Sequence, residues 1–152
     1  MPPQPIKTQS ILPRLDGIAR DVGMLRTLGK LPPQEFVREE NFIRAQFYLR
    51  RALEGVFHSG SHVLSRIPGG RVTEYKGITT RLGEVGVVTR DFARDSLKPM
   101  AGYRNRLTHF YADVQPEEIQ RIINQKLGDF DRFAAAVKHL LQHPDDFGLT
   151  IE

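Results

Sequence analysis

The chain of 152 residues contains no cysteine. Disulfide frameworks, thiolate metal sites, iron–sulfur clusters and cysteine nucleophiles are therefore excluded. No stretch approaches the roughly 18 apolar residues of a membrane span, and the N-terminal residues are polar and proline-rich, unlike a signal peptide. These absences predict a soluble, cytoplasmic protein without a membrane segment.

Signals for β-structure are also scarce. Apolar and polar residues do not alternate over any long stretch, and no dipeptide typical of a β-hairpin occurs. No internal repeat or long linker divides the chain, and its length suits one domain. Hydrophobic residues make up 39% of the chain, with 9 Phe and 4 Tyr to fill a core. We therefore predict a single all-α domain over residues 1–152.

Three long stretches carry apolar residues at steps of three and four, which is typical of amphipathic helices. The first covers 10–30, with Ser10 as its cap and Pro13 in its first turn. The second covers 39–66 and is expected to be the longest helix. The third begins at Pro116 and continues without a break to about residue 141.

Shorter helices are expected between residues 73 and 109. Thr89 suits the cap of one of them, and Pro99 is expected to kink or break it. A polar arm over about 1–9 and a tail over about 143–152 complete the chain. The whole pattern predicts an up-and-down helical bundle with a long second helix and shorter accessory helices.

The charge balance is basic. Twenty-two Lys and Arg residues face 18 Asp and Glu residues, which gives a formal net charge of +4, and 16 of the cations are Arg. Arginine can bind a phosphate through two parallel hydrogen bonds, so the bias is compatible with a nucleic-acid or nucleotide partner. Solvated helical surfaces are often rich in arginine too, so charge alone decides nothing about function.

Two histidine pairs have a spacing of four that occurs in metal sites, namely His58 with His62 and His139 with His143. Neither pair has a third ligand at usable spacing, so no metal site is predicted. The glycines at 83 and 86 lack the Lys and Ser or Thr of a phosphate-binding loop and are expected in turns. No cofactor is predicted.

One stretch, Tyr-Arg-Asn-Arg-Leu-Thr-His-Phe-Tyr over 103–111, carries a distinctive set of residues. Here the sequence resembles the HEPN superfamily and, within it, the HepT toxin family. The family signature is an Arg, four residues, a His, any residue and a Tyr. Arg104, His109 and Tyr111 match it, and Asn105 matches the polar residue that often follows the Arg.

The resemblance covers about residues 6–142. The proline-rich N-terminal segment, Pro33 and Gln115 depart from the family pattern, and none of them touches the signature. The resemblance implies a HEPN-like bundle and a metal-independent ribonuclease that acts as a homodimer. It also implies the toxin of a type VII-like toxin–antitoxin module, whose partner, an MNT-type nucleotidyltransferase, silences it by attaching AMP to Tyr111.

The residue types suit RNA cleavage by the 2′-OH. A histidine can move the protons, and an arginine can stabilise the doubly charged phosphorane. On an ideal helix Arg104 and His109 lie roughly 140° apart, whereas Asn105 shares a face with His109 and is expected to orient it. Either Arg104 reaches round the helix, or the helix loosens near Thr108, or the two groups meet across a subunit boundary. One histidine per chain is too few for paired acid and base work, which favours a dimer.

Two other hypotheses remain open. In the first, the chain is a non-catalytic HEPN module that binds a nucleotide or a partner protein. In the second, it is a purely structural dimerising domain. In the structural case His109 only interacts with the dipole at a helix end, and Tyr103, Phe110 and Tyr111 are core aromatics.

Overall fold

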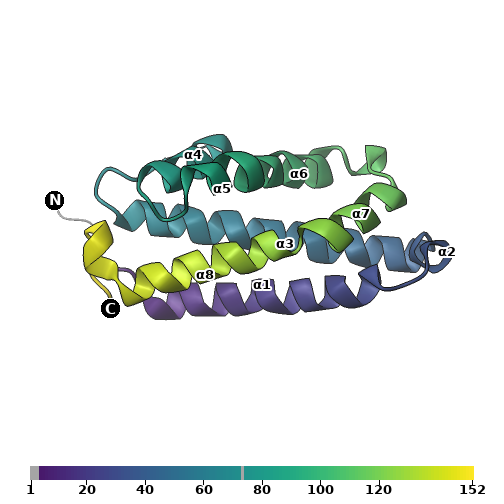
Figure 1. Cartoon of the computed structure of the whole chain (residues 1–152), viewed down its shortest axis with the longest axis horizontal. Helices are drawn as coiled ribbons and strands as arrows, with labels where there is room; N and C mark the ends of the chain where they lie inside the picture. Colours follow the sequence, from purple (N-terminus) through teal and green to yellow (C-terminus); the bar gives the residue numbers. More distant parts are fainter. Residues whose placement is uncertain (1–3, 73) are drawn as a thin grey trace.

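The computed structural model describes residues 4–72 and 74–152. The helices pass back and forth along one long axis (Figure 1). In chain order the helical segments are α1 (Thr8–Gly29), α2 (Pro33–Phe36), α3 (Glu39–Arg66), α4 (Tyr75–Glu84), α5 (Arg90–Phe92), the π-helical η1 (Ala93–Leu97), α6 (Lys98–His109), the 3₁₀ turn η2 (Tyr111–Asp113), α7 (Pro116–Lys126), α8 (Gly128–Gln142) and the 3₁₀ turn η3 (Pro144–Phe147). The described residues form no strand, which confirms the all-α up-and-down bundle.

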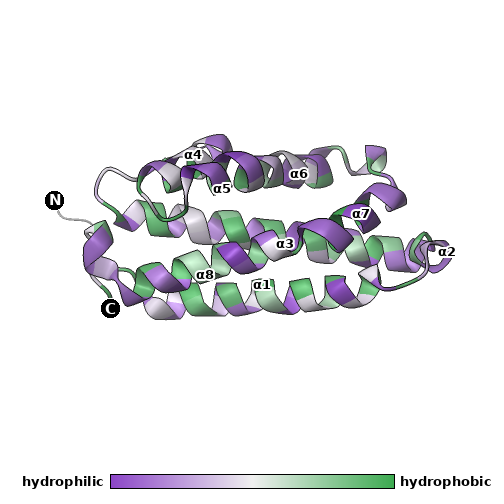
Figure 2. Ribbon diagram, viewed as in Figure 1, coloured by the Kyte–Doolittle hydropathy of each residue, from purple (hydrophilic) through white to green (hydrophobic). Residues whose placement is uncertain are grey.

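Helix α3 is the longest described helix, and its bounds match the prediction from its apolar pattern. It contacts α1, α2, α4, α6, α7 and α8. Apolar and polar residues alternate in bands along it and along α1 and α8 (Figure 2), as expected when each helix buries one side. Its buried residues are Ala45, Leu49, Ala52, Leu53, Val56, Phe57, Ser59, Gly60, Val63 and Leu64.

The packing of α1 against α3 has a polar and an apolar component. Asp21 on α1 is buried, and its carboxylate accepts hydrogen bonds from Arg51 Nε at 3.0 and 3.1 Å and from Arg51 Nη2 at 2.5 Å. Nearby, a Cβ at Gly55 would lie 2.8 Å from Ile18 Cγ1. The glycine therefore lets the two helices approach closely, and the buried carboxylate keeps a charged partner.

The two ends of the chain meet, which changes where α1 starts. Buried Ile6 donates its N–H to the Thr150 carbonyl at 2.9 Å and accepts from the Glu152 N–H at 2.8 Å. Because the chain is already held at this point, α1 begins at Thr8. The expectation that Ser10 caps the helix and that Pro13 lies in the first turn is wrong. Pro13 lies in the second turn, on the exposed side.

The third long helix is divided, contrary to the prediction of one helix from Pro116 to about residue 141. Helix α7 ends at Lys126, and α8 begins at Gly128. Glycine is about 1 kcal/mol less favourable than alanine within a helix, so it is a natural place for a break. After the break α8 runs along α1, while α7 also contacts α2.

Regular α-helix is interrupted just before Pro99, as expected, but the chain stays helical through this residue. The preceding residues Ala93–Leu97 are π-helical, and the Lys98 N–H donates to the Ala93 carbonyl five residues back. Pro99 then occupies the first turn of α6, where its missing N–H removes no helical bond. The predicted cap at Thr89 is confirmed, because its hydroxyl accepts from the Phe92 N–H at 3.1 Å.

The contact of Gly29 with α7 generates a stability prediction. A Cβ at Gly29 would lie 2.6 Å from Ile123 Cγ2 and 2.7 Å from Asn124 Oδ1. Gly29→Ala is therefore expected to lower the free energy of unfolding by about 1–3 kcal/mol. The matched control is Gly23→Ala in the same helix, where a Cβ meets nothing within 4 Å, and a gain of up to about 1 kcal/mol is expected. Urea unfolding measures both, and equal effects would contradict the packing argument.

Candidate active site

The signature residues lie on α6 and on the turn that follows it. Helix α6 packs against α3 and α4 and remains α-helical through His109. The Thr108 hydroxyl donates to the Arg104 carbonyl at 2.8 Å, one turn back. The helix therefore does not loosen near Thr108. Loosening there was one of the three arrangements considered from the sequence. The backbone leaves the helix at Phe110, with φ −130° and ψ 34°.

Arg104 stacks on an aromatic ring of a neighbouring helix. Its Cζ lies 4.3 Å from the centroid of Tyr75, the first residue of α4, and the Tyr75 ring packs edge-on against Phe57 of α3 at 5.4 Å. Arg104 Nε is buried without a hydrogen-bond partner, and the side chain forms no ion pair with any described carboxylate. A guanidinium placed over an aromatic face, with N–H groups that have no partner, is suited to binding a phosphate.

His109 is the last residue of α6, and its side chain is exposed. Its ring is edge-on to that of Phe110, with centroids 6.5 Å apart. Within the described residues no hydrogen bond joins it to Arg104 or to Asn105, which is also exposed. At 100° per residue, Arg104 and His109 project from the helix about 140° apart. A single chain therefore presents the two groups on different sides of α6.

The aromatic residues around His109 differ in burial. Phe110 is 58% exposed and Tyr111 is 64% exposed, so neither is a core aromatic. Tyr103 is half-buried, and its hydroxyl is buried without a hydrogen-bond partner. Tyr111 opens the η2 turn after the helix has ended, so it does not follow the helical rotation that would place it opposite His109. Its side chain is accessible to a modifying enzyme.

Arg106 connects α6 to α7 through Glu118. Its Nη2 donates to Glu118 Oε2 at 3.2 Å, and its Nη1 donates to Oε1 through a second, shorter bond. The guanidinium also lies 5.3 Å from the centroid of Tyr103. The hydrogen bond from Arg106 lowers the pKa of Glu118, and burial raises the pKa of Tyr103. Sequence reasoning missed this pair, because the partners lie on separate helices.

The histidine pairs show no metal-binding arrangement. The rings of His139 and His143 stack at 4.2 Å, and His143 Nδ1 lies 3.0 Å from the His139 carbonyl, at hydrogen-bonding distance. His58 is exposed, and His62 is partly buried. Across residues 4–72 and 74–152, no three His, Asp or Glu side chains gather to hold an ion. No helix in the described part of the chain is long and apolar enough to cross a membrane.

The sequence matches a family model and a curated relative. A family model described as "Ribonuclease HepT-like" matches residues 29–137, which include the whole of α6. A curated relative, a tRNA nuclease HepT of Aphanizomenon flos-aquae (strain 2012/KM1/D3), is 22% identical over 129 residues, covering 84% of this chain and 87% of the relative.

Two solved structures share the fold. One is a tri-AMPylated HEPN toxin of Shewanella oneidensis in complex with an MNT antitoxin. It superposes with a TM-score of 0.76 at 20% identity, covering 85% of this chain and 96% of the other. The second is a toxin–antitoxin with AMP-PNP, with a TM-score of 0.74 at 20% identity and coverage of 84% and 95%.

The ion pair of Glu118 generates a pH prediction. Because Arg106 lowers the pKa of Glu118 below its usual 4.5, the stabilisation from this pair is present above about pH 4.5 and is lost as the pH falls through the lowered value. Glu118→Gln is expected to lose about 1 kcal/mol of stability at pH 7 and progressively less toward pH 3. Urea unfolding at several pH values measures this difference.

The control is Glu117→Gln, which removes an exposed carboxylate from the same first turn of α7. Its stability is expected to change by less than about 0.5 kcal/mol at each pH. If the loss in Glu118→Gln stays the same from pH 7 to pH 3, the ionised pair is not its cause.

Proposed function

The chain belongs to the HepT-like ribonuclease family, and from this membership we propose that it is the RNA-cleaving toxin of a type VII-like toxin–antitoxin module. The observation that carries the proposal is the state of Arg104 on α6, stacked on Tyr75 with its Nε buried and unpartnered. An arginine with no carboxylate partner is suited to binding an anion such as a phosphate. An exposed histidine at the end of the same helix supplies an imidazole, the side chain used most often for proton transfer in catalysis.

In the proposed reaction the 2′-OH of RNA attacks the adjacent phosphate. A histidine removes the proton from the 2′-OH, and a second protonated group donates one to the 5′-oxygen that leaves. His109 is the group we assign to proton transfer, and Arg104 stabilises the phosphorane while negative charge develops on it. The products are a 2′,3′-cyclic phosphate and a 5′-hydroxyl, and no step uses a metal ion.

We propose that the active unit is a homodimer in which two α6 helices face one cleft. Arg104 and His109 project from different sides of α6, so one chain alone does not aim both at the same phosphate. A second copy supplies the other histidine that acid and base work requires. The exposure of Phe110 at 58% and Tyr111 at 64%, directly after His109, is compatible with an interface beside the site.

The proposed partner is an MNT-type nucleotidyltransferase antitoxin that attaches AMP to Tyr111. The neighbouring fold from Shewanella oneidensis is described as tri-AMPylated and in complex with an MNT antitoxin, which supports this assignment. Tyr111 is exposed on a turn, two residues beyond His109. An adenylate there adds negative charge and bulk where an RNA phosphate would bind.

We predict that the purified chain cleaves RNA in the presence of EDTA and that His109→Ala and Arg104→Ala each reduce the rate by at least about 100-fold, the usual contribution of general acid–base or oxyanion groups. Transfer RNA is the first substrate to assay, given the name of the curated relative. Product ends identify the nucleophile, and the control is His139→Ala, distant from α6. Loss of activity on chelation would overturn the metal-independent mechanism.

The same assay tests the shared site. If each site takes Arg104 from one subunit and His109 from the other, mixing the two inactive variants is expected to restore part of the activity, because some mixed dimers contain one intact site. A variant of His109 that cleaves at the normal rate, or a chain that binds RNA without cutting it, would favour the non-catalytic module instead.

Coexpression with a cognate MNT-type nucleotidyltransferase is predicted to add one or more AMP groups to Tyr111 and to abolish cleavage without unfolding. Mass spectrometry of the peptide that contains Tyr111 locates the modification, and circular dichroism checks the fold. Tyr111→Phe is expected to escape modification and remain toxic. Adenylate on a different residue, or an adenylated chain that still degrades RNA, would overturn the assignment of Tyr111.

A further inference from the structure

A basic groove lies between the start of α1 and the end of α3, and no residue of α6 lines it. It is open, about 760 Å³ in volume, and polar along most of its length. Its described lining residues come from α1, α3 and the segments next to them, and Val72 is the only apolar one among them: Gln4, Arg14, His58, Ser61, His62, Ser65, Arg66, Arg71 and Val72. None of these residues carries a carboxylate, so the charged groups among them are all cationic.

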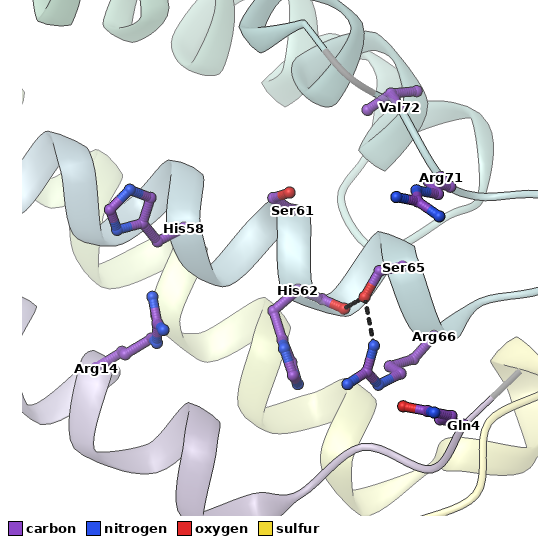
Figure 3. A pocket seen from close by; sticks show the side chains of 9 residues that line it. All are labelled: Gln4, Arg14, His58, Ser61, His62, Ser65, Arg66, Arg71 and Val72. Atoms are coloured by element: carbon purple, nitrogen blue, oxygen red, sulfur yellow. Dashed lines mark hydrogen bonds between the residues drawn. The ribbon is translucent and has the colours of Figure 1, made fainter.

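The arginines of the groove project from different elements. Figure 3 shows Arg14 of α1 and Arg66 of α3 on either side of His62, with Arg71 on the segment after α3. None of the three arginines pairs with a carboxylate of the described residues. Arg66 Nη1 donates to the Ser65 hydroxyl at 3.0 Å, while its Nε is buried without a partner. The three arginines therefore line one groove, and no carboxylate of the described residues neutralises their charge.

The positive charge of these arginines affects His62. Its Nε2 is buried without a hydrogen-bond partner, and burial together with the charges of Arg66 and Arg14 lowers its pKa. A cluster that disfavours one more positive charge favours an anion for the same electrostatic reason. The unpartnered Nε2 adds a polar atom able to contact it.

From this geometry we propose that the groove binds the phosphate backbone of an RNA strand. It holds a part of the substrate that lies outside the cleavage site. The inference rests on the proposed ribonuclease function. Arginine forks match phosphate oxygens, and contacts to phosphates position a strand without reading its bases. The groove contains no Phe or Tyr on which a base could stack, so it suits a backbone better than a free nucleotide.

The position of the groove explains its use. Figure 1 places the end of α3 near the start of α1 and the end of α8, whereas α6 runs toward the opposite end of the molecule. A strand that occupies both regions must extend along the bundle. The groove is therefore expected to contribute affinity for long RNA and little to the cleavage of a dinucleotide bound beside His109, at the far end of α6.

The test uses the full-length chain with His109→Ala, so that RNA is bound and not cut. Arg14→Gln with Arg71→Gln removes two exposed groove cations. Arg44→Gln with Arg50→Gln removes two exposed cations from the first half of α3 and serves as the matched control. Fluorescence anisotropy with a labelled single-stranded RNA measures the dissociation constant over a range of salt concentrations.

The groove variant is expected to bind the RNA about 10-fold more weakly, with a salt slope about 1.4 lower, since each phosphate contact contributes roughly 0.7 for a single strand. In the background with His109 intact, the KM for long RNA is expected to rise while dinucleotide cleavage stays unchanged. Equal binding by the groove variant and the control would overturn the proposal. So would displacement of the RNA by ATP from the wild-type groove at micromolar concentration.

A second pair of readings separates this inference from the proposed function. If the chain binds RNA through the groove and cleaves none, the proposed ribonuclease function is wrong, and RNA binding by the groove is confirmed. A chain that cleaves RNA at the normal KM after Arg14→Gln and Arg71→Gln overturns the groove alone. Arg66→Gln provides an independent third substitution, with thermal unfolding to check that this half-buried side chain is not needed for folding.

Discussion

The packing of α3 against six other helices determines the rest of the architecture. At 1.5 Å per residue, its 28 residues extend over about 42 Å. No single partner helix buries it, and it is in contact with α1, α2, α4, α6, α7 and α8. The surrounding helices therefore run along it, and the chain has to turn back at each end of the bundle. The glycine contact of Gly55 with Ile18 and the ion pair of Asp21 with Arg51 fix the closest of these partners.

The candidate site follows from the placement of α6 in this arrangement. Helix α6 is short, and its buried residues Met100, Ala101 and Leu107 hold it on the bundle. Its remaining sides are free to carry polar groups. Arg104 reaches Tyr75, which in turn contacts Phe57 on α3, so the guanidinium is fixed indirectly by the core. His109 has no such support, because the helix ends there and the chain leaves toward η2.

What the sequence predicted depended on how local the determining interactions are. The bounds of α3 and the cap at Thr89 were predicted correctly, since apolar spacing and a hydroxyl three residues from its partner are visible in a short window. The start of α1 was not, because it depends on Ile6 pairing with the far end of the chain. The signature residues were found from the resemblance of the 103–111 stretch to the HepT family pattern, which is itself local in the sequence. The role of Tyr75 under Arg104 had no local signal, because the two meet only when α4 folds against α6.

The π-helical segment before α6 lets the chain carry an extra residue without turning the site away from its support. A π-helical turn accommodates roughly one residue more than the α-helix around it within about the same rotation. Removing one residue from Ala93–Leu97 is therefore expected to restore an uninterrupted α-helix and to leave Arg104 facing Tyr75. A deletion between Lys98 and Arg104 has no such compensation, and it would turn Arg104 by about 100° about the helix axis. Relatives of this chain should therefore vary in length within Ala93–Leu97 but not between Lys98 and Arg104.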